Sequence, residues 1–228
     1  MRLLILILSF FPFTVLAYPI DTSIGFATGY TWSQVELNDT VRPADGGTEV
    51  PSYGDIKSQD MPWNLYLAFQ VHENYGFEMG YLDYGSVNFV KSLITKSNDG
   101  DFVSSRIRNI DISTQGLYIN HVLHLPIMKN IKLLAKAGIF LGSNNYTETE
   151  NAITMVDNDS DELVEKAYQE FHNSSKSFAK GQLAIGLIYQ QQKDWSIRLQ
   201  LNHINYDNAA EKEEFTQWFS SISLERAL

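Results

Sequence analysis

The stretch Pro62–Tyr84 reads PWNLYLAFQVHENYGFEMGYLDY and alternates apolar and polar residues on both sides of a short polar break. Successive side chains of a β-strand point to opposite faces, so this pattern predicts an antiparallel hairpin that turns at His72-Glu73-Asn74. Each arm has about ten residues, close to the ~9–11 that a tilted strand needs to cross a bilayer. The stretch therefore predicts a transmembrane β-hairpin.

The same alternation occurs in six further segments, which brings the predicted strands to eight. They are Ser23–Ser33, Ile112–Leu125, Ile131–Gly142, Phe178–Gln190, Trp195–Tyr206 and Phe215–Arg226. Long and short connections alternate between them, as in outer-membrane barrels with tight periplasmic turns and longer outer loops. We predict an all-β, eight-stranded antiparallel up-and-down transmembrane β-barrel. Its four long outer loops are Gln34–Asp60, Val87–Asp111, Ser143–Ser177 and Asp207–Glu214.

The N-terminus predicts a signal peptide over residues 1–17, followed by the barrel domain over residues 18–228. Met1-Arg2 supplies a positive charge, Leu3–Leu16 is almost unbroken apolar sequence, and Val15-Leu16-Ala17 suits cleavage. A membrane-anchor helix is the alternative, but Pro12 interrupts a run already shorter than the ~18–20 residues of a span. Export and a barrel together predict the outer membrane of a Gram-negative cell.

Composition excludes several functions. The chain of 228 residues has no cysteine, which excludes disulfides, thiolate metal sites and a cysteine nucleophile. Its net charge of −10 argues against a nucleic-acid partner, which would require a basic face. We expect no cofactor, no metal site and no catalytic residue, and a monomeric protein.

A lipocalin-type soluble barrel is the competing fold. Its strands also alternate apolar and polar residues, but the apolar side chains point into the barrel and the polar ones point to the solvent. The face that we assign to the lumen is rich in glycine and alanine, which suit a cramped interior and are unusual on a solvated surface. The Gly-x-Trp opening of lipocalins is missing, since Gly29-Tyr30-Thr31-Trp32 has a different spacing. These features favour the membrane barrel.

Charged residues of the lumen face are predicted to pair, because a barrel of eight strands is just wide enough to be filled by side chains and an enclosed charge needs a partner. A structural network is the main interpretation, and a gated proton or ion path is the alternative. On the outer face, aromatic residues near strand ends predict girdles at both membrane interfaces. The network residues are Glu78, Lys136, Arg198, Lys180 and Glu225, and the girdle residues are Trp63, Phe69, Tyr75, Tyr81, Tyr189, Trp195 and Trp218.

The long segments carry the acidity of the chain. In order, their net charges are −4, +1, −6 and −3, which add up to −12. Solvation is one interpretation, and binding of divalent cations or of a basic partner is the other. Asp157–Asp161 is similar to the start of a calcium loop, but Glu162 and Tyr168 stand where an EF-hand needs Gly and Glu. Asp159–His172 has a helix-capping pattern and predicts a short helix.

The chain resembles the outer-membrane β-barrel family typified by the transmembrane domain of OmpA and by OmpX. The resemblance covers Tyr18–Leu228 and rests on the strand rhythm and on the segments Gly76–Tyr84 and Lys136-Ala137-Gly138. It implies a lumen filled with acidic and basic side chains. Family members usually end in an aromatic residue, whereas this chain ends Leu224–Leu228. The chain is also similar in size to accessory colonization factor A barrels.

We expect a non-enzymatic protein whose outer loops serve adhesion, surface interaction or envelope integrity. Its partners would be outer-membrane lipid or lipopolysaccharide around the barrel, and an extracellular or host-surface molecule at the loops. His172-Asn173-Ser174 is similar to the His-x-Ser pair of lipid A deacylases, so a lipid A-modifying enzyme is one alternative. A periplasmic lipocalin-like binding protein is the other.

Overall fold

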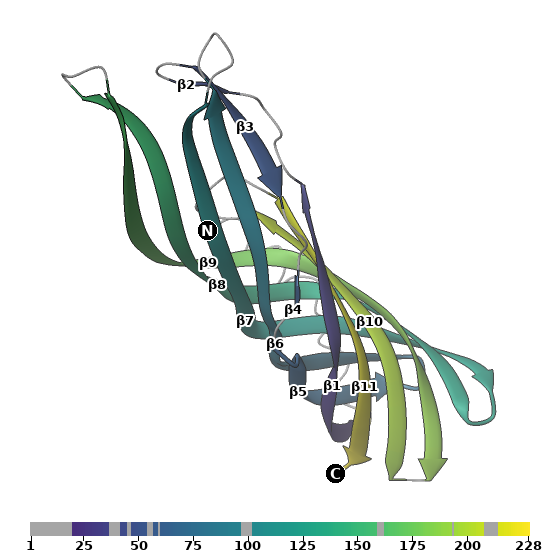
Figure 1. Ribbon diagram of the computed structural model, residues 1–228. Coiled ribbons are helices and arrows are strands. Elements are labelled where there is room, and N and C mark those ends of the chain that lie inside the picture. Colours follow the sequence, from purple (N-terminus) through teal and green to yellow (C-terminus); the bar gives the residue numbers. More distant parts are fainter. Residues whose placement is uncertain are drawn as a thin grey trace, which may run out of the picture.

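The computed structural model describes residues 20–36, 42–44, 47–53, 57–58, 60–96, 102–158, 162–192, 194–207 and 214–228. All regular elements within these ranges are β-strands (Figure 1). They are β1 (Asp21–Glu36), β2 (Arg42–Ala44), β3 (Gly47–Tyr53), β4 (Lys57–Ser58), β5 (Trp63–His72), β6 (Tyr75–Lys96), β7 (Phe102–Met128), β8 (Ile131–Asn158), β9 (Glu162–Gln192), β10 (Trp195–Asp207) and β11 (Glu214–Ala227). The predicted signal peptide, residues 1–17, lies outside the described residues. In the described ranges there is no helix long and apolar enough to span a membrane.

Eight strands form a closed antiparallel ring. In ring order they are β1, β5, β6, β7, β8, β9, β10 and β11, and each pairs with the next. The ring closes where β1 pairs with β11, from Ser23 opposite Ala227 to Glu36 opposite Glu214. The tight turns and the C-terminus lie at one end, and the long connections at the other (Figure 1). The predicted eight-stranded up-and-down barrel is confirmed.

The apolar face of each strand points away from the ring. Phe26, Leu117 and Ile185 are each more than half exposed, and residues of the same phase form an apolar belt around the barrel. Residues of the opposite phase, such as Ala27 and Asn64, are buried inside. A soluble barrel would bury the belt, so this arrangement fits a membrane barrel and not the lipocalin-type alternative.

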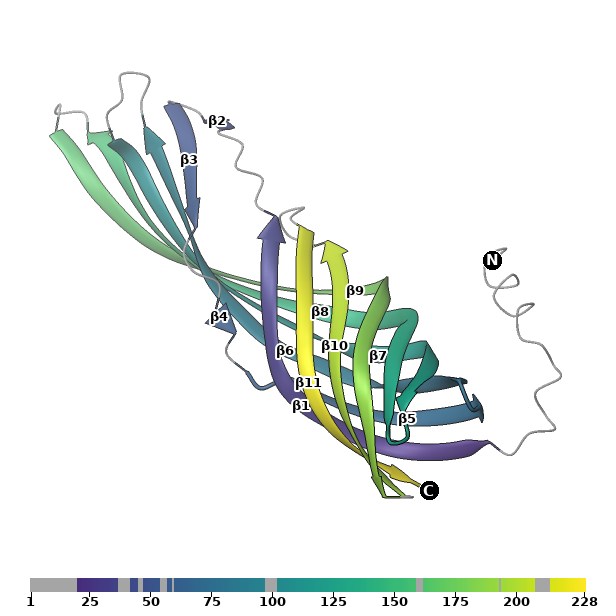
Figure 2. The same ribbon diagram turned by 90° about the vertical axis from the view of Figure 1, so that its right-hand side faces the viewer.

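Four strands continue far beyond the ring. β6, β7, β8 and β9 have 22, 27, 28 and 31 residues, against the ~9–11 that span a bilayer. Their outer parts form a curved sheet that rises past the ends of β1, β10 and β11 (Figure 2), and β3 pairs with the outer part of β6. We call this sheet the extension. The long connections thus lie at the predicted end, but much of their length is strand.

The helix predicted over Asp159–His172 is wrong. Residues Glu162–His172 belong to β9 and pair with β8 without a register shift. The capping pattern is a local signal, whereas pairing with β8 supplies backbone hydrogen bonds on one side of the strand from Glu162 to His172, so tertiary structure overrides the local preference.

β6 bends where it leaves the ring. Its register with β7 shifts between Asp83 and Ser86, and Gly85 has a φ of 76° that favours glycine. The Gly85 N–H donates to Asp83 Oδ1 at 2.8 Å, and the Ser86 hydroxyl donates to Asp60 Oδ2 at 2.6 Å. Burial and the carboxylate of Asp60 raise the pKa of Asp111 on β7. A bulge of this kind bends a strand, so it lets the extension diverge from the ring.

Candidate functional site in the lumen and the extension

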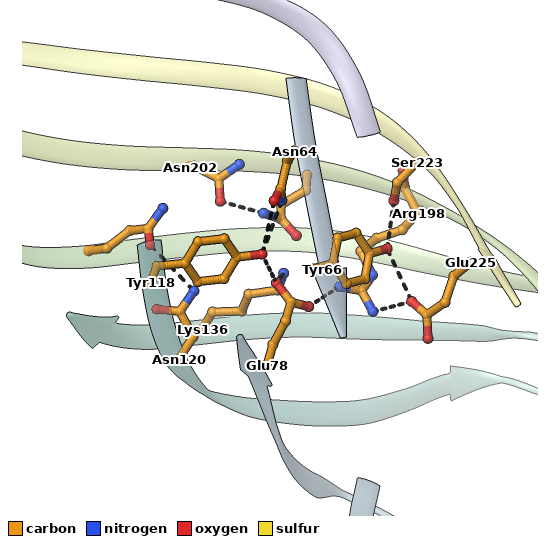
Figure 3. A network of polar contacts seen from close by, with 12 residues as sticks. Asn64, Tyr66, Glu78, Tyr118, Asn120, Lys136, Arg198, Asn202, Ser223 and Glu225 are labelled. Atoms are coloured by element: carbon orange, nitrogen blue, oxygen red, sulfur yellow. Dashed lines mark hydrogen bonds and ion pairs between the residues drawn. The ribbon is translucent and has the colours of Figure 1, made fainter. Parts of the chain in front are cut away.

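Glu78 of β6 is the centre of a buried polar cluster in the lumen (Figure 3). Its carboxylate accepts from Lys136 Nζ at 2.5 Å on one oxygen and from Arg198 Nη1 at 2.5 Å on the other. The Tyr118 hydroxyl also donates to it at 2.8 Å. The side chains of Glu78 and Lys136 are fully buried and that of Arg198 is 2% exposed. One carboxylate therefore compensates two buried cations, which come from β8 and β10.

Arg198 links this cluster to the last strand. Its second terminal nitrogen pairs with Glu225 of β11, which also accepts from the hydroxyl of Ser23 on β1 at 2.5 Å. The ring of Tyr66 lies under the guanidinium at 4.8 Å, and its hydroxyl donates to Ser223 and Glu225. The polar cluster thus connects strands on opposite sides of the ring.

The structure brings together four of the five charged residues predicted for the lumen network, and the fifth lies elsewhere. Lys180 is half-buried on β9 opposite Phe140, whereas Lys136 is opposite Ala184. Four residues of strand correspond to about 13 Å, so Lys180 stands well outside the polar cluster. The periodicity places Lys180 on the inner face but cannot resolve its height in the barrel.

An aromatic cluster fills the lumen on the extension side of these charges. Tyr84, Phe140 and Phe219 are fully buried, with Tyr84 at 5.7 Å from Phe140 and 6.2 Å from Phe219 between ring centroids. Phe178 packs on Phe140 at 5.9 Å. Sequence reasoning missed this cluster because it looked for small and polar residues on the inner face. The sequence does indicate it, because Phe140 lies an even number of residues from Lys136 on the same strand and therefore points to the same inner face.

At the turn end, the lumen opens into a cavity of about 520 Å³. Arg198 and Glu225 of the polar cluster line it, together with His124, Lys132 and Asp21. The lumen therefore has three levels along its axis: an open vestibule, the polar cluster and the aromatic cluster.

The predicted girdle residues lie on the outer face near strand ends. Trp63 stacks on Tyr81 at 5.3 Å towards the extension, where Trp218 also stacks on Trp32 at 6.3 Å. Near the turn end, Tyr75 contacts His121 through a 2.6 Å hydrogen bond. Phe69, Tyr189 and Trp195 are at the same end, and the Arg226 guanidinium lies over the Trp195 ring at 5.5 Å.

The inner face of the extension holds a second set of ion pairs. Arg108 Nε of β7 is 3.2 Å from Glu148 and 2.7 Å from Glu150 of β8. Glu148 and Glu150 are 6% and 4% exposed, and the Tyr146 hydroxyl also donates to Glu148. Both acids belong to the segment Ser143–Ser177, so this part of the predicted acidic loop does not display its charge. It turns inwards and pairs with a base of the segment Val87–Asp111.

On β8 and β9, the outer face of the extension carries no charged side chain among the residues 143–151 and 167–179, whose side chains the structure describes. Its side chains on β8 and β9 are mostly Ser, Thr and Asn, and they have the phase opposite to Glu148. The exposed members are Asn145, Thr147, Asn151, Gln169, Asn173, Ser175 and Ser177, together with Phe171 at 69% exposure. The two faces of one sheet therefore offer different chemistry to a partner.

The described residues contain no group of three or more His, Asp or Glu side chains arranged to hold a metal ion. The calcium-loop segment, Asp157–Asp161, lies partly outside the described residues.

A closed ring of eight antiparallel strands with an apolar belt outside and paired charges inside is a transmembrane β-barrel of the outer-membrane type. The family model described as OmpA-like transmembrane domain matches residues 21–228, and the chain belongs to this family. The protein is therefore located in the outer membrane of a Gram-negative cell.

Several solved structures are similar to the chain at low identity. Ail, the attachment invasion locus protein of Yersinia pestis, is 10% identical, with 90% of this chain and 97% of that chain covered and a TM-score of 0.40. Neisserial surface protein A is 6% identical, with 92% and 97% covered and a TM-score of 0.42. The outer membrane protease OmpT from Escherichia coli is 10% identical, with 92% and 96% covered and a TM-score of 0.42. No curated protein matches the chain.

Proposed function

We propose that the protein is a non-enzymatic scaffold that holds the extension outside the cell for adhesion or another surface contact. The observation that carries this proposal is the length of β6, β7, β8 and β9, which is two to three times what the membrane requires. The carboxylates paired with Arg108 are buried, and the buried side chains of Phe89 and Ile110 join the base of the extension to the aromatic cluster of the lumen. Such a sheet presents a defined surface instead of a mobile loop.

The contents of the lumen support a scaffold more than an ion path. Each charge of the polar cluster has an opposite charge within hydrogen-bond distance, which stabilises the ring by linking its strands. The aromatic cluster then packs the space between these charges and the extension. The role that we assign to both clusters is to keep the barrel rigid beneath the extension.

Shortening the extension tests this function. A variant lacking residues 91–108 and 148–172, with an Asn-Gly turn at each junction, keeps the ring and its lumen clusters. We expect cells that express it to bind cultured epithelial cells and matrix-coated wells no better than cells without the protein. A heat-dependent gel shift must show that the shortened barrel is folded. Unchanged binding by a folded shortened barrel contradicts the proposal.

Envelope integrity is the second role that the same variant addresses. A barrel that only supports the membrane would protect cells against detergent with or without its extension. We expect cells with the shortened protein and cells with the complete protein to be equally sensitive to detergent, although only the complete protein supports binding. The two measurements on one variant then distinguish envelope integrity from adhesion.

The enzyme alternative has one observation in its favour. Glu170, His172 and Ser174 share one face of β9, and His172 Nε2 is 3.5 Å from Glu170. However, both of these side chains are more than half exposed, and a base in this position has no dry, preorganised site around it. We expect Ser174→Ala to leave the lipid A mass spectrum of expressing cells identical to that of the wild type. Loss of a deacylated species in this variant would establish the enzyme.

A further inference from the structure

The vestibule is a cavity of about 520 Å³ at the turn end of the lumen. Small-molecule sites in proteins usually have about 300–1,000 Å³ and combine apolar walls with a few polar groups. Val122 and Ile188 supply apolar wall to the vestibule, and Arg198 and Glu225 supply polar groups. Beyond these two charges the lumen is filled by the polar cluster and the aromatic cluster. The vestibule therefore has the form of a binding pocket and not of a passage.

Two buried side chains that line the vestibule have nitrogen atoms without hydrogen-bond partners among the described residues. His124 is 8% exposed, and neither its Nδ1 nor its Nε2 has a partner. The terminal nitrogens of Arg198 pair with Glu78 and Glu225, but its Nε has no partner. An imidazole carries at least one N–H, and the Nε of a guanidinium always carries one. Buried donors are normally satisfied, so these two require an acceptor from outside the described part of the chain.

Lys132 of β8 brings a third donor to the same place. Ile188 of β9 is opposite Lys132 on one side and opposite Arg198 on the other. His124 of β7 is opposite Leu134, which is the next inner-face residue after Lys132 on β8. Neighbouring strands are about 4.8 Å apart, so the side chains of Lys132 and Arg198 can reach one small group between them. Lys132 forms no ion pair with another described residue.

The carboxylate of Glu225, which also lines the vestibule, is already occupied. It accepts hydrogen bonds from Arg198, Ser23 and Tyr66. The polar cluster as a whole contains two carboxylates and two cations, so it is neutral. Lys132 therefore leaves the inner part of the vestibule with a positive charge that no carboxylate of the cluster compensates.

Two further carboxylates line the vestibule at the turn end. Asp21 is the first residue of β1, and Asp194 lies in the turn between β9 and β10. Both side chains are exposed, and neither forms an ion pair with another described residue. The vestibule is therefore positive in its inner part and negative towards the solvent.

We propose that the vestibule binds a small zwitterion with a carboxylate and an ammonium group, namely a free amino acid or a dipeptide of the periplasm. The carboxylate points inwards and accepts from His124, Lys132 and Arg198 Nε. The ammonium group points outwards to Asp21 and Asp194. Opposite charges in this order match those of the cavity, and such complementarity selects one orientation of the ligand. The tight turns of an outer-membrane barrel face the periplasm, so the ligand enters from that side.

Other small ligands satisfy fewer of these groups. An anion without an ammonium group meets the inner donors but is repelled by Asp21 and Asp194. A simple cation is repelled by Lys132 at the inner part. A water molecule satisfies single donors, but it brings no charge to Lys132 and no apolar contact to Ile188. A zwitterion is the class of ligand that uses both ends of the cavity and its apolar wall.

The test uses the full barrel in lipid nanodiscs, with isotope-labelled histidine rings observed by NMR and alanylalanine as the probe. We expect alanylalanine to shift the ring signals of His124 in a saturable manner and to leave those of His172 in the extension unchanged. N-acetyl-alanylalanine lacks the ammonium group and alanylalanine amide lacks the carboxylate, so each should bind at least about tenfold more weakly. Absence of a saturable shift at tens of millimolar, as expected if only water fills the cavity, overturns the proposal. Equal binding of the acetylated dipeptide also overturns it, because it indicates a simple anion site.

Matched lysine variants test the inner end of the site. Lys132→Met removes the inner charge and should weaken the binding of alanylalanine about tenfold. Lys129→Met removes the same charge from the exposed turn between β7 and β8 and should bind like the wild type. Equal affinity of the two variants, both folded by gel shift, overturns the proposal.

A double variant tests the outer end. Asp21→Asn, Asp194→Asn removes both carboxylates that would hold the ammonium group. We expect it to bind alanylalanine and N-acetyl-alanylalanine equally well, because the reason for the preference is gone. A folded double variant that keeps the wild-type preference for the free dipeptide overturns the proposal.

This site is separate from the proposed function, because the vestibule and the extension lie at opposite ends of the barrel (Figure 1). The variant with a shortened extension should therefore bind alanylalanine like the complete protein, whatever its effect on adhesion. Loss of dipeptide binding in the folded shortened barrel would overturn the inference, since it would place the site in the extension.

Discussion

Replacing Glu78 by Gln is expected to lower the free energy of unfolding by about 3–5 kcal/mol, the usual cost of breaking a buried ion pair from one side. Glutamine keeps the size of the side chain but removes the carboxylate that forms an ion pair with Lys136 at 2.5 Å. Arg198 retains Glu225 as an ion-pair partner, whereas no second ion pair of the fully buried Lys136 is present among the described residues. The penalty is therefore the desolvation of one lysine.

Urea unfolding of the barrel in lipid vesicles, followed by tryptophan fluorescence and gel shift, measures this change. Glu73→Gln in the exposed turn is the control and should stay within about 0.5 kcal/mol of the wild type. The double variant Glu78→Gln, Lys136→Met removes the orphaned charge and should recover much of the loss. A double variant that is less stable than Glu78→Gln alone would show that Lys136 is not the source of the penalty.

Replacing Gly29 by Ala is expected to cost about 3 kcal/mol and to reduce the fraction of protein that reaches the folded form. A Cβ at this position would stand 1.8 Å from the carbonyl oxygen of Ser220. Gly29 and Ser221 are opposite each other in the pairing of β1 with β11, which closes the ring. The neighbouring backbone must shift to admit even a methyl group, and overpacking against a backbone is costly.

Gly181→Ala is the matched control, because a Cβ at Gly181 meets nothing within 4 Å. It should fold like the wild type or gain a little stability, since alanine restricts the unfolded chain. The measurement is the fraction of refolded protein that shows the heat-dependent gel shift. Equal folding of the Gly29 and Gly181 variants would mean that close strand approach at the seam is not required.

Periodicity in the sequence predicted the ring well and the lumen only in part. The phase of Glu78, Lys136, Arg198 and Glu225 places them on the inner face, because side-chain direction in a strand depends only on odd or even position. The height of each residue depends on strand tilt and register, which is why the same reasoning could not separate Lys180 from the others. The aromatic cluster around Phe140 was missed because an inner face was equated with a polar one.

The extension shows where local sequence reasoning fails. Ser, Asn, Asp and Glu between Ser143 and Ser177 are typical of loops, and the capping pattern at Asp159 is typical of a helix. In the structure, β8 and β9 instead pair along this segment, and Arg108 from a distant segment compensates Glu148 and Glu150. A charge count of the segment alone could not reveal that these acids are buried.

By itself, the sequence determined the membrane barrel, the number of its strands, the outward apolar face and the end that carries the long connections. These follow from a period of two and from connection length, which are properties of neighbouring residues. Only the tertiary structure decided which inner charges meet, what fills the lumen and how far the strands continue. Each of these depends on register between strands that are far apart in the chain, and period-two alternation carries no information on register beyond odd and even.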